Sequence, residues 1–161
     1  MRIDAPDADA VRSVAQNMRA RDLDEIMAVS HADTQADLID ALVARYADAP
    51  DAYCFGDEQG WIAIGAMAAH RPNVITLGFF ATDRFPALAL PIARFARREL
   101  FPAYRARGVH RIDCVSKADY PAAHKWIALL GLRRAPHTLR GFGRDGQDFL
   151  QFEWVRDDLA G

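Results

Sequence analysis

The stretch that decides the fold of this chain is Val74-Ile75-Thr76-Leu77-Gly78-Phe79-Phe80. It is apolar at both alternating positions, which is typical of a strand covered on both faces. The hydrophobic period then becomes helical between Phe85 and Arg107, and Arg111 to Val115 is again strand-like. Strands separated by a helix need a crossover connection, so the sequence predicts an α/β fold with a mixed sheet. The helical stripe consists of Leu88, Ile92, Phe95, Leu100 and Tyr104.

The segment before this stretch predicts one strand followed by two helices. Residues 11–15, Val11 to Ala15, alternate weakly and are expected to be the first strand. Asp22 is expected to be the N-cap of a helix reaching Ser30, because Glu25 stands three residues later, as in a capping box. A second helix is expected over residues 33–46, where apolar residues recur every four positions.

The next segment predicts an antiparallel meander. Residues 52–55 and 61–70 are strand-like, and the five residues Gly56 to Gly60 between them are turn formers. A second turn over residues 71–73 leads into the stretch quoted above. Pro102 is expected to kink or end the long helix that follows, since it removes a backbone donor and clashes with the preceding turn.

The last third of the chain predicts one helix and two strands. The helix runs from Tyr120 to Leu130 and stops at Gly131, and the strands cover residues 133–139 and 149–155. The predicted order is therefore β-α-α-β-β-β-α-β-α-β-β: a mixed sheet of about seven strands with about four flanking helices. With no repeat or long linker, residues 1–161 are expected to form a single domain.

Composition narrows the class of protein. The 161 residues are 51% hydrophobic and 26% charged, as in ordinary globular proteins, and the formal net charge is −2. That balance argues against a general nucleic-acid or membrane protein. Cys54 and Cys114 are expected to be buried thiols rather than a disulfide. The acidic N-terminus is not expected to be a secretory signal, and no apolar stretch is long enough to span a membrane, so a cytoplasmic protein is expected.

The element order resembles that of the GNAT (Gcn5-related N-acetyltransferase) fold over nearly the whole chain. The most specific resemblance is the last helix, where that family often shows N-x-x-A-x-x-F-Y-x-x-x-G-F. Ala123, Trp126, Gly131 and Leu132 match this pattern, whereas Ile127 stands at the tyrosine position. The resemblance implies a GNAT fold and, if the protein is an enzyme, acetyl-CoA as the acyl donor and an amine as the acceptor.

Three departures from the family pattern concern its chemistry. The family's tyrosine often protonates the departing thiolate, and Ile127 has no proton to donate. The usual glutamate base is absent from Val74 to Phe80, which leaves Asp83 as the nearest substitute or as a helix cap. The loop that binds pyrophosphate in the family has no glycine here, and Pro86 lacks a donor.

Several residues are candidates to bind or activate the donor if the protein is active. Thr82 and Arg84 are expected to contact phosphate beside Phe85, and a backbone N–H near Phe79 or Phe80 is expected to polarise the thioester carbonyl. Ser116, Lys117 and Tyr120 either contact the pantetheine arm or cap the last helix, the second being favoured. His124 is the candidate acid or base on that helix, with a surface histidine as the alternative. The resulting set is catalytic Asp83 and His124, cofactor-binding Phe79, Phe80, Thr82, Arg84, Phe85, Ser116 and Lys117, and no metal ligand.

The arginines of the long helix are open to more than one interpretation. The first is a solvated face paired with acids such as Glu99. The others are a surface for a partner protein, a clamp for the coenzyme's phosphates, and a contact for DNA in a packaged particle. The arginines concerned are Arg94, Arg97, Arg98, Arg105 and Arg107. Without interleaved aromatic residues, sequence-specific nucleic-acid recognition is not expected.

The C-terminal half also resembles the GNAT-like internal virion proteins of short-tailed phages, in the arginine-rich helix and the Arg144-Asp145-Gly146-Gln147 hairpin before an aromatic strand. This resemblance implies a phage-encoded structural or assembly protein with degenerate catalytic motifs. Its partners would be virion proteins or a host protein, with no membrane, in the host cytoplasm or packaged in the particle. The alternative is an active N-acyltransferase that depends on acetyl-CoA.

Overall fold

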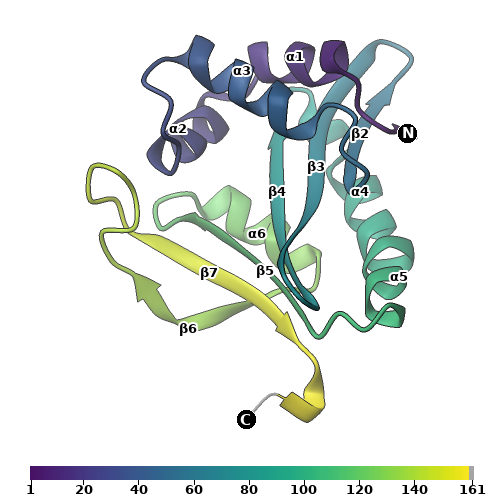
Figure 1. Cartoon of the computed structure of the whole chain (residues 1–161), viewed down its shortest axis with the longest axis vertical. Coiled ribbons are helices and arrows are strands. Elements are labelled where there is room, and N and C mark those ends of the chain that lie inside the picture. The colour runs from purple at the N-terminus through teal and green to yellow at the C-terminus, as the bar shows by residue number, and fades with distance from the viewer. Residues whose placement is uncertain (160–161) are drawn as a thin grey trace. The chain divides into compact units, whose positions relative to one another are not determined.

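The computed structural model describes residues 1–159, and Figure 1 shows the order of the elements. The strands are β1 (Arg2–Asp4), β2 (Ala52–Asp57), β3 (Gly60–Arg71), β4 (Val74–Ala81), β5 (Arg111–Lys117), β6 (Arg133–Leu139) and β7 (Phe149–Val155). The helices are α1 (Ala8–Gln16), α2 (Ala20–Ala28), α3 (Gln35–Tyr46), α4 (Ala89–Phe95), α5 (Phe101–Ala106) and α6 (Pro121–Leu129). A 3-10 helix covers Phe85–Ala87 and a π-helical turn joins α4 to α5 over Ala96–Leu100.

The strands form one mixed sheet of seven strands in the order β1-β2-β3-β4-β5-β7-β6. β4 and β5 pair in parallel, whereas β1 with β2, β2 with β3, β5 with β7 and β6 with β7 pair antiparallel. The predicted α/β class, the mixed sheet and the seven strands are confirmed. No helix in the part of the chain that the structure describes is long and apolar enough to cross a membrane.

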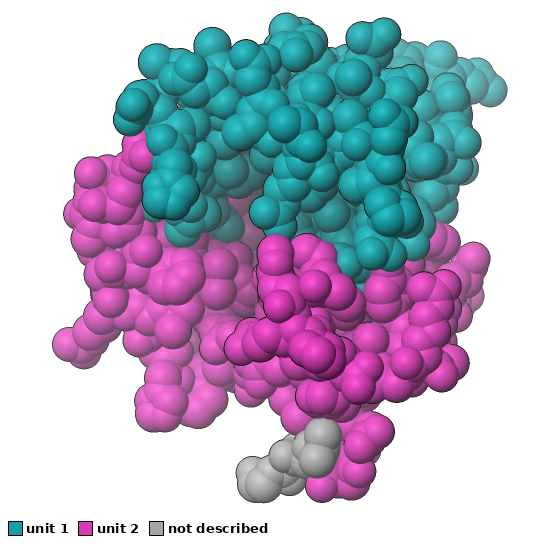
Figure 2. Space-filling model, viewed as in Figure 1, with its two compact units in different colours: residues 1–67, 78–90 teal, residues 68–77, 91–161 magenta. Residues whose placement is uncertain are grey.

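The chain divides into two compact units, coloured separately in Figure 2. Unit 1 comprises residues 1–67 and 78–90, and unit 2 comprises residues 68–77 and 91–161. The division passes through β3 and β4, so each unit holds part of both strands. The expectation of a single domain stays a prediction.

Unit 1 is built around a core that α1 and α3 share with β2, β3 and β4. Its fully buried members include Val11, Val14, Cys54, Ile64 and Phe80. α3 begins with a capping box, in which Thr34 accepts from the Asp37 N–H at 3.1 Å and the Asp37 carboxylate accepts from the Thr34 N–H at 3.0 Å. The helix predicted over residues 33–46 is confirmed.

The predicted strand over Val11 to Ala15 is wrong, because these residues lie in α1. Asp7 caps this helix by accepting a hydrogen bond from the Ala10 N–H at 2.7 Å. Val11, Val14 and Ala15 are buried at helical spacing, which looks like weak alternation when only five residues are compared. The first strand is instead Arg2–Asp4, and α1 is the helix beyond the four expected.

The N-cap predicted at Asp22 is also wrong. α2 begins at Ala20 with Arg19 as its N-cap, and Asp22 is buried in the first turn of the helix. Its carboxylate does not serve the helix end, because it binds groups from elsewhere in unit 1, as described below.

The meander is confirmed with a tighter first turn than predicted. Asp57 pairs with Gly60, so the turn between β2 and β3 contains two residues rather than five. Gly60 has a φ of 125°, which only glycine adopts easily, and Asn73 turns the chain between β3 and β4 with a φ of 60°. β4 matches the predicted central strand with one added residue.

In unit 2 the long helix is interrupted ahead of Pro102 rather than at it. The Phe101 N–H bonds to the Ala96 carbonyl, five residues back, so one wide π turn separates α4 from α5. Pro102 then stands in the first turn of α5, where its missing N–H costs little. The helix therefore does not end at Pro102, and its one irregular turn lies just before that residue.

The rest of unit 2 follows the predicted elements closely. β6 and β7 have the predicted bounds, and α6 ends before Gly131, whose φ of 89° suits a helix C-terminus. Arg111 on β5 bonds to Asp113 at 2.8 Å and to Glu153 on β7, and Thr76 on β4 donates to Asp113 at 2.9 Å. This network ties three neighbouring strands together by their side chains.

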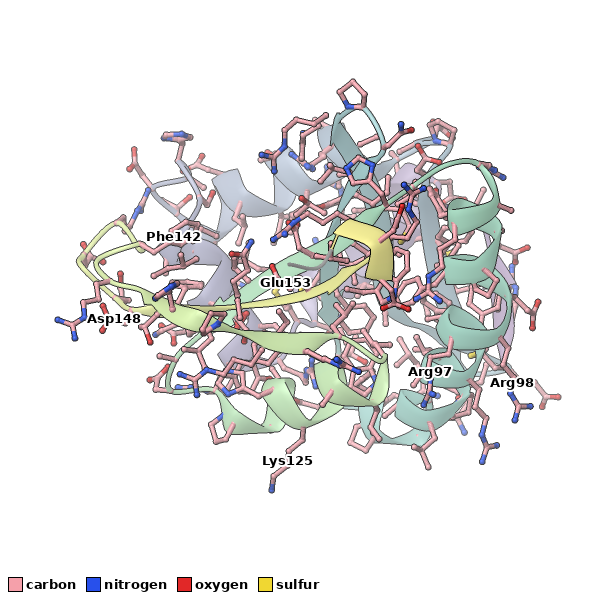
Figure 3. The ribbon with its side chains drawn as sticks, turned by 90° about the horizontal axis from the view of Figure 1, so that it is seen from below. Arg97, Arg98, Lys125, Phe142, Asp148 and Glu153 are labelled. Carbon is pink, nitrogen blue, oxygen red and sulfur yellow. The ribbon has the colours of Figure 1, made fainter. Side chains whose placement is uncertain are left out.

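The loop between β6 and β7 is ordered by its own hydrogen bonds. The Asp148 carboxylate accepts from the Gly141 N–H at 2.9 Å, and the Gln147 carbonyl accepts from the Gly143 N–H at 2.9 Å. Phe142 packs against the buried ring of Phe149 while 48% of it stays exposed. Figure 3 shows Phe142 and Asp148 at this end of the hairpin.

Cys54 and Cys114 are both buried and free, as predicted. Burial raises the pKa of the Cys54 thiol from 9.0 to about 11. We expect about a 100-fold lower thiolate fraction than in an exposed cysteine near neutral pH, and a correspondingly slower reaction with a disulfide reagent. The raised pKa favours folding below pH 9, and that contribution is lost as the pH rises from 9 toward 11.

The measurement is the rate of thiol labelling of the Cys114→Ala variant, with the native and urea-unfolded states compared. A variant that also carries Ser13→Cys on the exposed face of α1 supplies an accessible control thiol. Equal labelling rates for Cys54 and the added cysteine would contradict the prediction.

Candidate functional site

The predicted site residues fall into two groups, one in each unit. Unit 1 holds Phe79, Phe80, Thr82, Asp83, Arg84 and Phe85, at the end of β4 and in the loop after it. Unit 2 holds Ser116, Lys117 and His124, at the end of β5 and on α6. The structure brings the residues of each group together, and each group is described by itself.

The end of β4 is packed by aromatic rings. Phe80 is 2% exposed and its ring lies 5.9 Å from that of Tyr46, while the half-buried Phe79 ring lies 5.3 Å from that of Phe85. Gly78 precedes them, and a Cβ at this position would stand 2.7 Å from the Tyr46 hydroxyl. The strand can therefore approach Tyr46 only because residue 78 has no side chain.

A buried ion pair holds the last residue of β4. The Asp22 carboxylate accepts bonds from the Arg19 guanidinium at 2.7 and 2.9 Å and from the Ala81 N–H at 2.9 Å. The Arg19 N–H in turn donates to the Ala81 carbonyl at 2.9 Å, and its guanidinium lies 4.5 Å from the centre of the Phe85 ring. Both polar groups of Ala81 are thus satisfied by two residues at the start of α2.

Sequence reasoning missed this pair. Asp22 was assigned to a helix cap, and Arg19 to no role. The only signal available was the pairing of an arginine and an aspartate three residues apart, which occurs on many helix surfaces and does not indicate burial.

The loop after β4 uses its own backbone donors. The Thr82 N–H donates to Ile62, the Phe85 N–H to Thr82 at 3.0 Å and the Leu88 N–H to Phe85 at 2.9 Å. Pro86 has no N–H, and the Arg84 N–H lies 3.3 Å from the Thr82 hydroxyl oxygen. In a glycine-containing phosphate loop such donors point toward the ligand. Here a 3-10 turn takes them up, so Thr82 and Phe85 offer a phosphate little main-chain binding.

Arg84 is engaged by a carboxylate. Its guanidinium bonds to both oxygens of Asp57 at 2.7 and 2.6 Å, and this bond lowers the pKa of the Asp57 carboxyl. Both side chains are partly exposed, at 39% and 34%, so the pair is open to water. Arg84 can reach a phosphate only by exchanging Asp57 for it.

Asp83 is exposed and forms no ion pair or side-chain hydrogen bond within residues 1–159. It is not a helix cap, because the following 3-10 helix has Arg84 as its N-cap and shows no side-chain cap bond. Of the two roles weighed for Asp83, the cap is excluded, and the role of proton acceptor stays a prediction.

In unit 2 the end of β5 is buried. Ser116 is 1% exposed and Lys117 is 8% exposed, and the Lys117 ammonium lies 3.9 Å from the Asp119 carboxylate. Tyr120 is the N-cap of α6, but its side chain forms no cap bond. Tyr120 therefore occupies the cap position that was favoured, without a side-chain bond to the helix end. Contact of Ser116 and Lys117 with a pantetheine arm stays a prediction.

His124 is half-buried and oriented by the main chain. Its Nε2 lies 2.8 Å from the Lys117 carbonyl, and its ring centre lies 5.3 Å from that of Phe152. A carbonyl can only accept, so Nε2 carries the hydrogen and Nδ1 of the neutral ring has a lone pair. His124 remains partly exposed, so both the surface histidine and the candidate acid or base stay open.

The ladder between β4 and β5 is short. It pairs Val74 with Arg111, Ile75 with Ile112 and Thr76 with Asp113, whereas β5 pairs with β7 along its whole length to Lys117. β4 continues for five residues past Thr76, to Ala81, without a pairing to β5 in residues 1–159.

No family model matches the sequence, and no curated protein matches it. Solved structures share its fold. A ribosomal-protein-alanine N-acetyltransferase from Brucella melitensis is 15% identical with a TM-score of 0.69, over 96% of this chain and 99% of that chain. The ribosomal-protein-S18-alanine N-acetyltransferase of Escherichia coli is 15% identical with a TM-score of 0.67, over 99% and 96%.

A spermidine N-acetyltransferase from Vibrio cholerae, solved in complex with CoA and spermine, is 12% identical with a TM-score of 0.70, over 96% of this chain and 95% of that chain. A Bacillus anthracis acetyltransferase described as GNAT family matches with a TM-score of 0.68. The chain therefore has the GNAT fold. Identities this low establish the fold and leave the activity to be inferred from the site.

The Asp22 pair predicts a large loss of stability on substitution. In Asp22→Ala the partly buried Arg19 loses its carboxylate and the Ala81 N–H loses its acceptor, which is expected to lower the free energy of unfolding by about 3 kcal/mol. The measurement is urea denaturation. Asp24→Ala, on the same helix but exposed and 3.8 Å from Arg21, should change it by less than about 0.5 kcal/mol. Equal effects of the two substitutions would show that the pair does not hold β4.

Proposed function

We propose that this protein is an N-acyltransferase that moves an acyl group from a coenzyme A thioester to an amine. The observation that carries the proposal is the short parallel ladder, in which β4 extends past Thr76 without pairing to β5, in a sheet with the GNAT order of strands. The solved structures that share this fold and are described as acetyltransferases, two of them for ribosomal-protein alanine and one for spermidine, support it.

The residues of unit 1 suit the reacting end of the donor. The thioester supplies an electrophilic carbonyl carbon and a thiolate leaving group. A main-chain N–H of β4 past the ladder, at Phe79 or Phe80, would donate a hydrogen bond to the carbonyl oxygen as negative charge develops on it. Most of the acceleration would come from holding the amine nitrogen about 3 to 3.5 Å from the carbonyl carbon.

The reaction must remove a proton from the attacking amine and release the thiolate of coenzyme A. As the C–N bond forms and the C–S bond breaks, the proton of the attacking amine would pass to the Asp83 carboxylate, directly or through water. The role of His124, which belongs to unit 2, as an acid or base stays a prediction. Ile127 stands where the family often has a tyrosine acid, so the thiolate would leave without protein assistance. A thiol ionises near pH 8.5, which makes its thiolate a good leaving group near neutral pH.

The phosphate end of the donor fits less well. The loop after β4 has used its backbone donors, and its one cation, Arg84, is bonded to Asp57. Binding of the pyrophosphate would therefore rest on Arg84 after Asp57 is displaced. We expect weak binding of the donor for this reason.

The same loop favours a second candidate. A GNAT-fold protein without phosphate donors and without the tyrosine acid would act through its surfaces, as a structural or assembly protein. The resemblance of the C-terminal half to internal virion proteins of short-tailed phages would make its partners virion proteins or a host protein. Its location would then be the host cytoplasm or the phage particle.

Calorimetric titration with acetyl-CoA and free CoA separates the candidates. Asp57→Asn should tighten acetyl-CoA binding by up to about fivefold, the worth of an exposed ion pair, because it frees Arg84 while the asparagine oxygen still accepts from the Gln59 N–H. Arg84→Gln should weaken binding. Glu58→Gln, in the same turn, removes one negative charge without touching Arg84 and should change binding less.

Acetyl transfer is then measured as release of thiol with spermidine and with a peptide bearing an N-terminal alanine. The acyltransferase is supported if acetyl-CoA binds more tightly to Asp57→Asn and more weakly to Arg84→Gln, and if acetyl transfer is also observed. Absence of binding by both the unchanged protein and Asp57→Asn at millimolar ligand would overturn it in favour of the surface-acting protein.

A further inference from the structure

The two compact units carry opposite net charges. Residues 1–67 and 78–90 contain 6 Lys and Arg against 14 Asp and Glu, a formal charge of −8, whereas residues 68–77 and 91–161 contain 14 against 8, a formal charge of +6. The net charge of −2 for the whole chain hides this separation. A local basic surface therefore exists despite the acidic total.

The arginines of unit 1 interact with other residues of the same unit. Arg2, Arg12, Arg19, Arg21 and Arg84 each form an ion pair with an aspartate, and Arg45 lies over the ring of Tyr46. Every arginine of this unit therefore has a partner within the unit.

Six cations on the long helix, α6 and β6 of unit 2 have no ion-pair or hydrogen-bond partner within the described chain. Their side chains are exposed. We call this set the arginine surface: Arg94, Arg97, Arg98, Lys125, Arg133 and Arg134. The pairing expected between the long helix and acids such as Glu99 is not found in the described chain. Arg105 and Arg107 differ from this set, because they lie over the rings of Trp154 and Tyr104.

These residues come from elements that pack together. The Arg97 Nε lies 3.9 Å from the point that a Cβ on Gly131 would occupy, so the long helix contacts the end of α6. Arg133 and Arg134 come two and three residues after Gly131 and begin β6, the edge strand of the sheet. Lys125 stands six residues before Gly131, about 9 Å along α6. Figure 3 shows Lys125 pointing away from α6, and Arg97 and Arg98 on the long helix.

We propose that the arginine surface binds the phosphate backbone of a nucleic acid without regard to sequence. Five of its six members are arginines, whose planar forks suit phosphate oxygens. Arg94 and Arg98 are about 6 Å apart along the helix axis, and a duplex strand carries one negative charge about every 3.4 Å along its axis. Six cations without intramolecular partners favour a ligand that carries many negative charges in a row.

The six cations are not accompanied by a large exposed aromatic side chain in the described chain. Phe142, the one aromatic residue among the large exposed hydrophobic side chains there, lies on the β6–β7 loop and not among these cations. We therefore expect contacts mainly with the backbone. The proposal does not depend on the acyltransferase activity, since none of these residues belongs to the candidate site.

The test is fluorescence anisotropy with a labelled 20-nucleotide single strand, as RNA and as DNA, each in two unrelated sequences. We expect a dissociation constant on the order of 1 to 100 μM near physiological salt, equal for the two sequences, and a lower constant in low salt. Substituting Arg94, Arg98 and Arg133 together by glutamine should weaken binding at least about tenfold. The slope of log affinity against log salt should fall by about 0.7 for each phosphate that the variant no longer neutralises.

The matched control substitutes Arg12, Arg21 and Arg45 of unit 1 by glutamine, which changes the net charge equally but leaves the arginine surface intact. It should bind as the unchanged protein does. Thermal unfolding of both variants checks that they fold, and the single substitution Lys125→Glu repeats the test if the triple variant does not fold.

Equal loss of affinity in the two triple variants, or no binding in low salt, would overturn the proposal. Two other results would replace it. Binding to vesicles of anionic lipid but not to oligonucleotide would assign the surface to a membrane. Salt-sensitive self-association, abolished in the Arg94, Arg98 and Arg133 variant without any nucleic-acid binding, would assign it to the acidic unit of a second copy.

Discussion

The end of β4 depends on one buried carboxylate. Asp22 accepts from the Arg19 guanidinium and from the Ala81 N–H, and the Arg19 N–H closes the link by donating to Ala81. A buried charge is tolerated only where its lone pairs are filled, and here the main chain of the central strand fills one of them. This contact holds the residue from which the loop from Thr82 to Leu88 departs, beside the candidate residues of unit 1.

That loop is saturated from within. A phosphate-binding loop needs hydrogen-bond donors without intramolecular partners. Here the main-chain N–H groups around Phe85 bond to carbonyls of the turns, and the Arg84 guanidinium bonds to Asp57. The two bonds differ in strength: the main-chain bonds belong to a packed turn, whereas the Arg84–Asp57 pair is exposed and can exchange partners. In an acyltransferase, the exposed Arg84–Asp57 pair would have to break before Arg84 could bind the donor's phosphates. In a protein that acts through its surfaces, the pair would not interfere with function.

The positions of many candidate site residues along the chain could be predicted from the sequence. Their hydrogen-bond and ion-pair partners could not. His124 was located on the correct helix, whereas Ser116 and Lys117, expected just after the strand that begins at Arg111, form its last two residues. The tautomer of His124 could not be predicted, since it depends on the carbonyl of Lys117, seven residues away and aligned only by the turn into α6. Arg84 was assigned to phosphate because the sequence does not reveal Asp57, 27 residues earlier, as its partner. The arginines of the long helix were found, but their lack of carboxylate partners was visible only in three dimensions.

The sequence by itself determined the class of fold and the positions of six of the seven strands to within two residues, because the period of buried side chains is a local property of the chain. It failed at α1, where five residues are too few to separate a helical period from an alternating one. The tertiary structure alone decided which charges are paired. Asp22, Asp57 and the arginine surface have ordinary local sequences, and a charge becomes buried, bonded or free only through the groups that folding brings within a few ångströms of it.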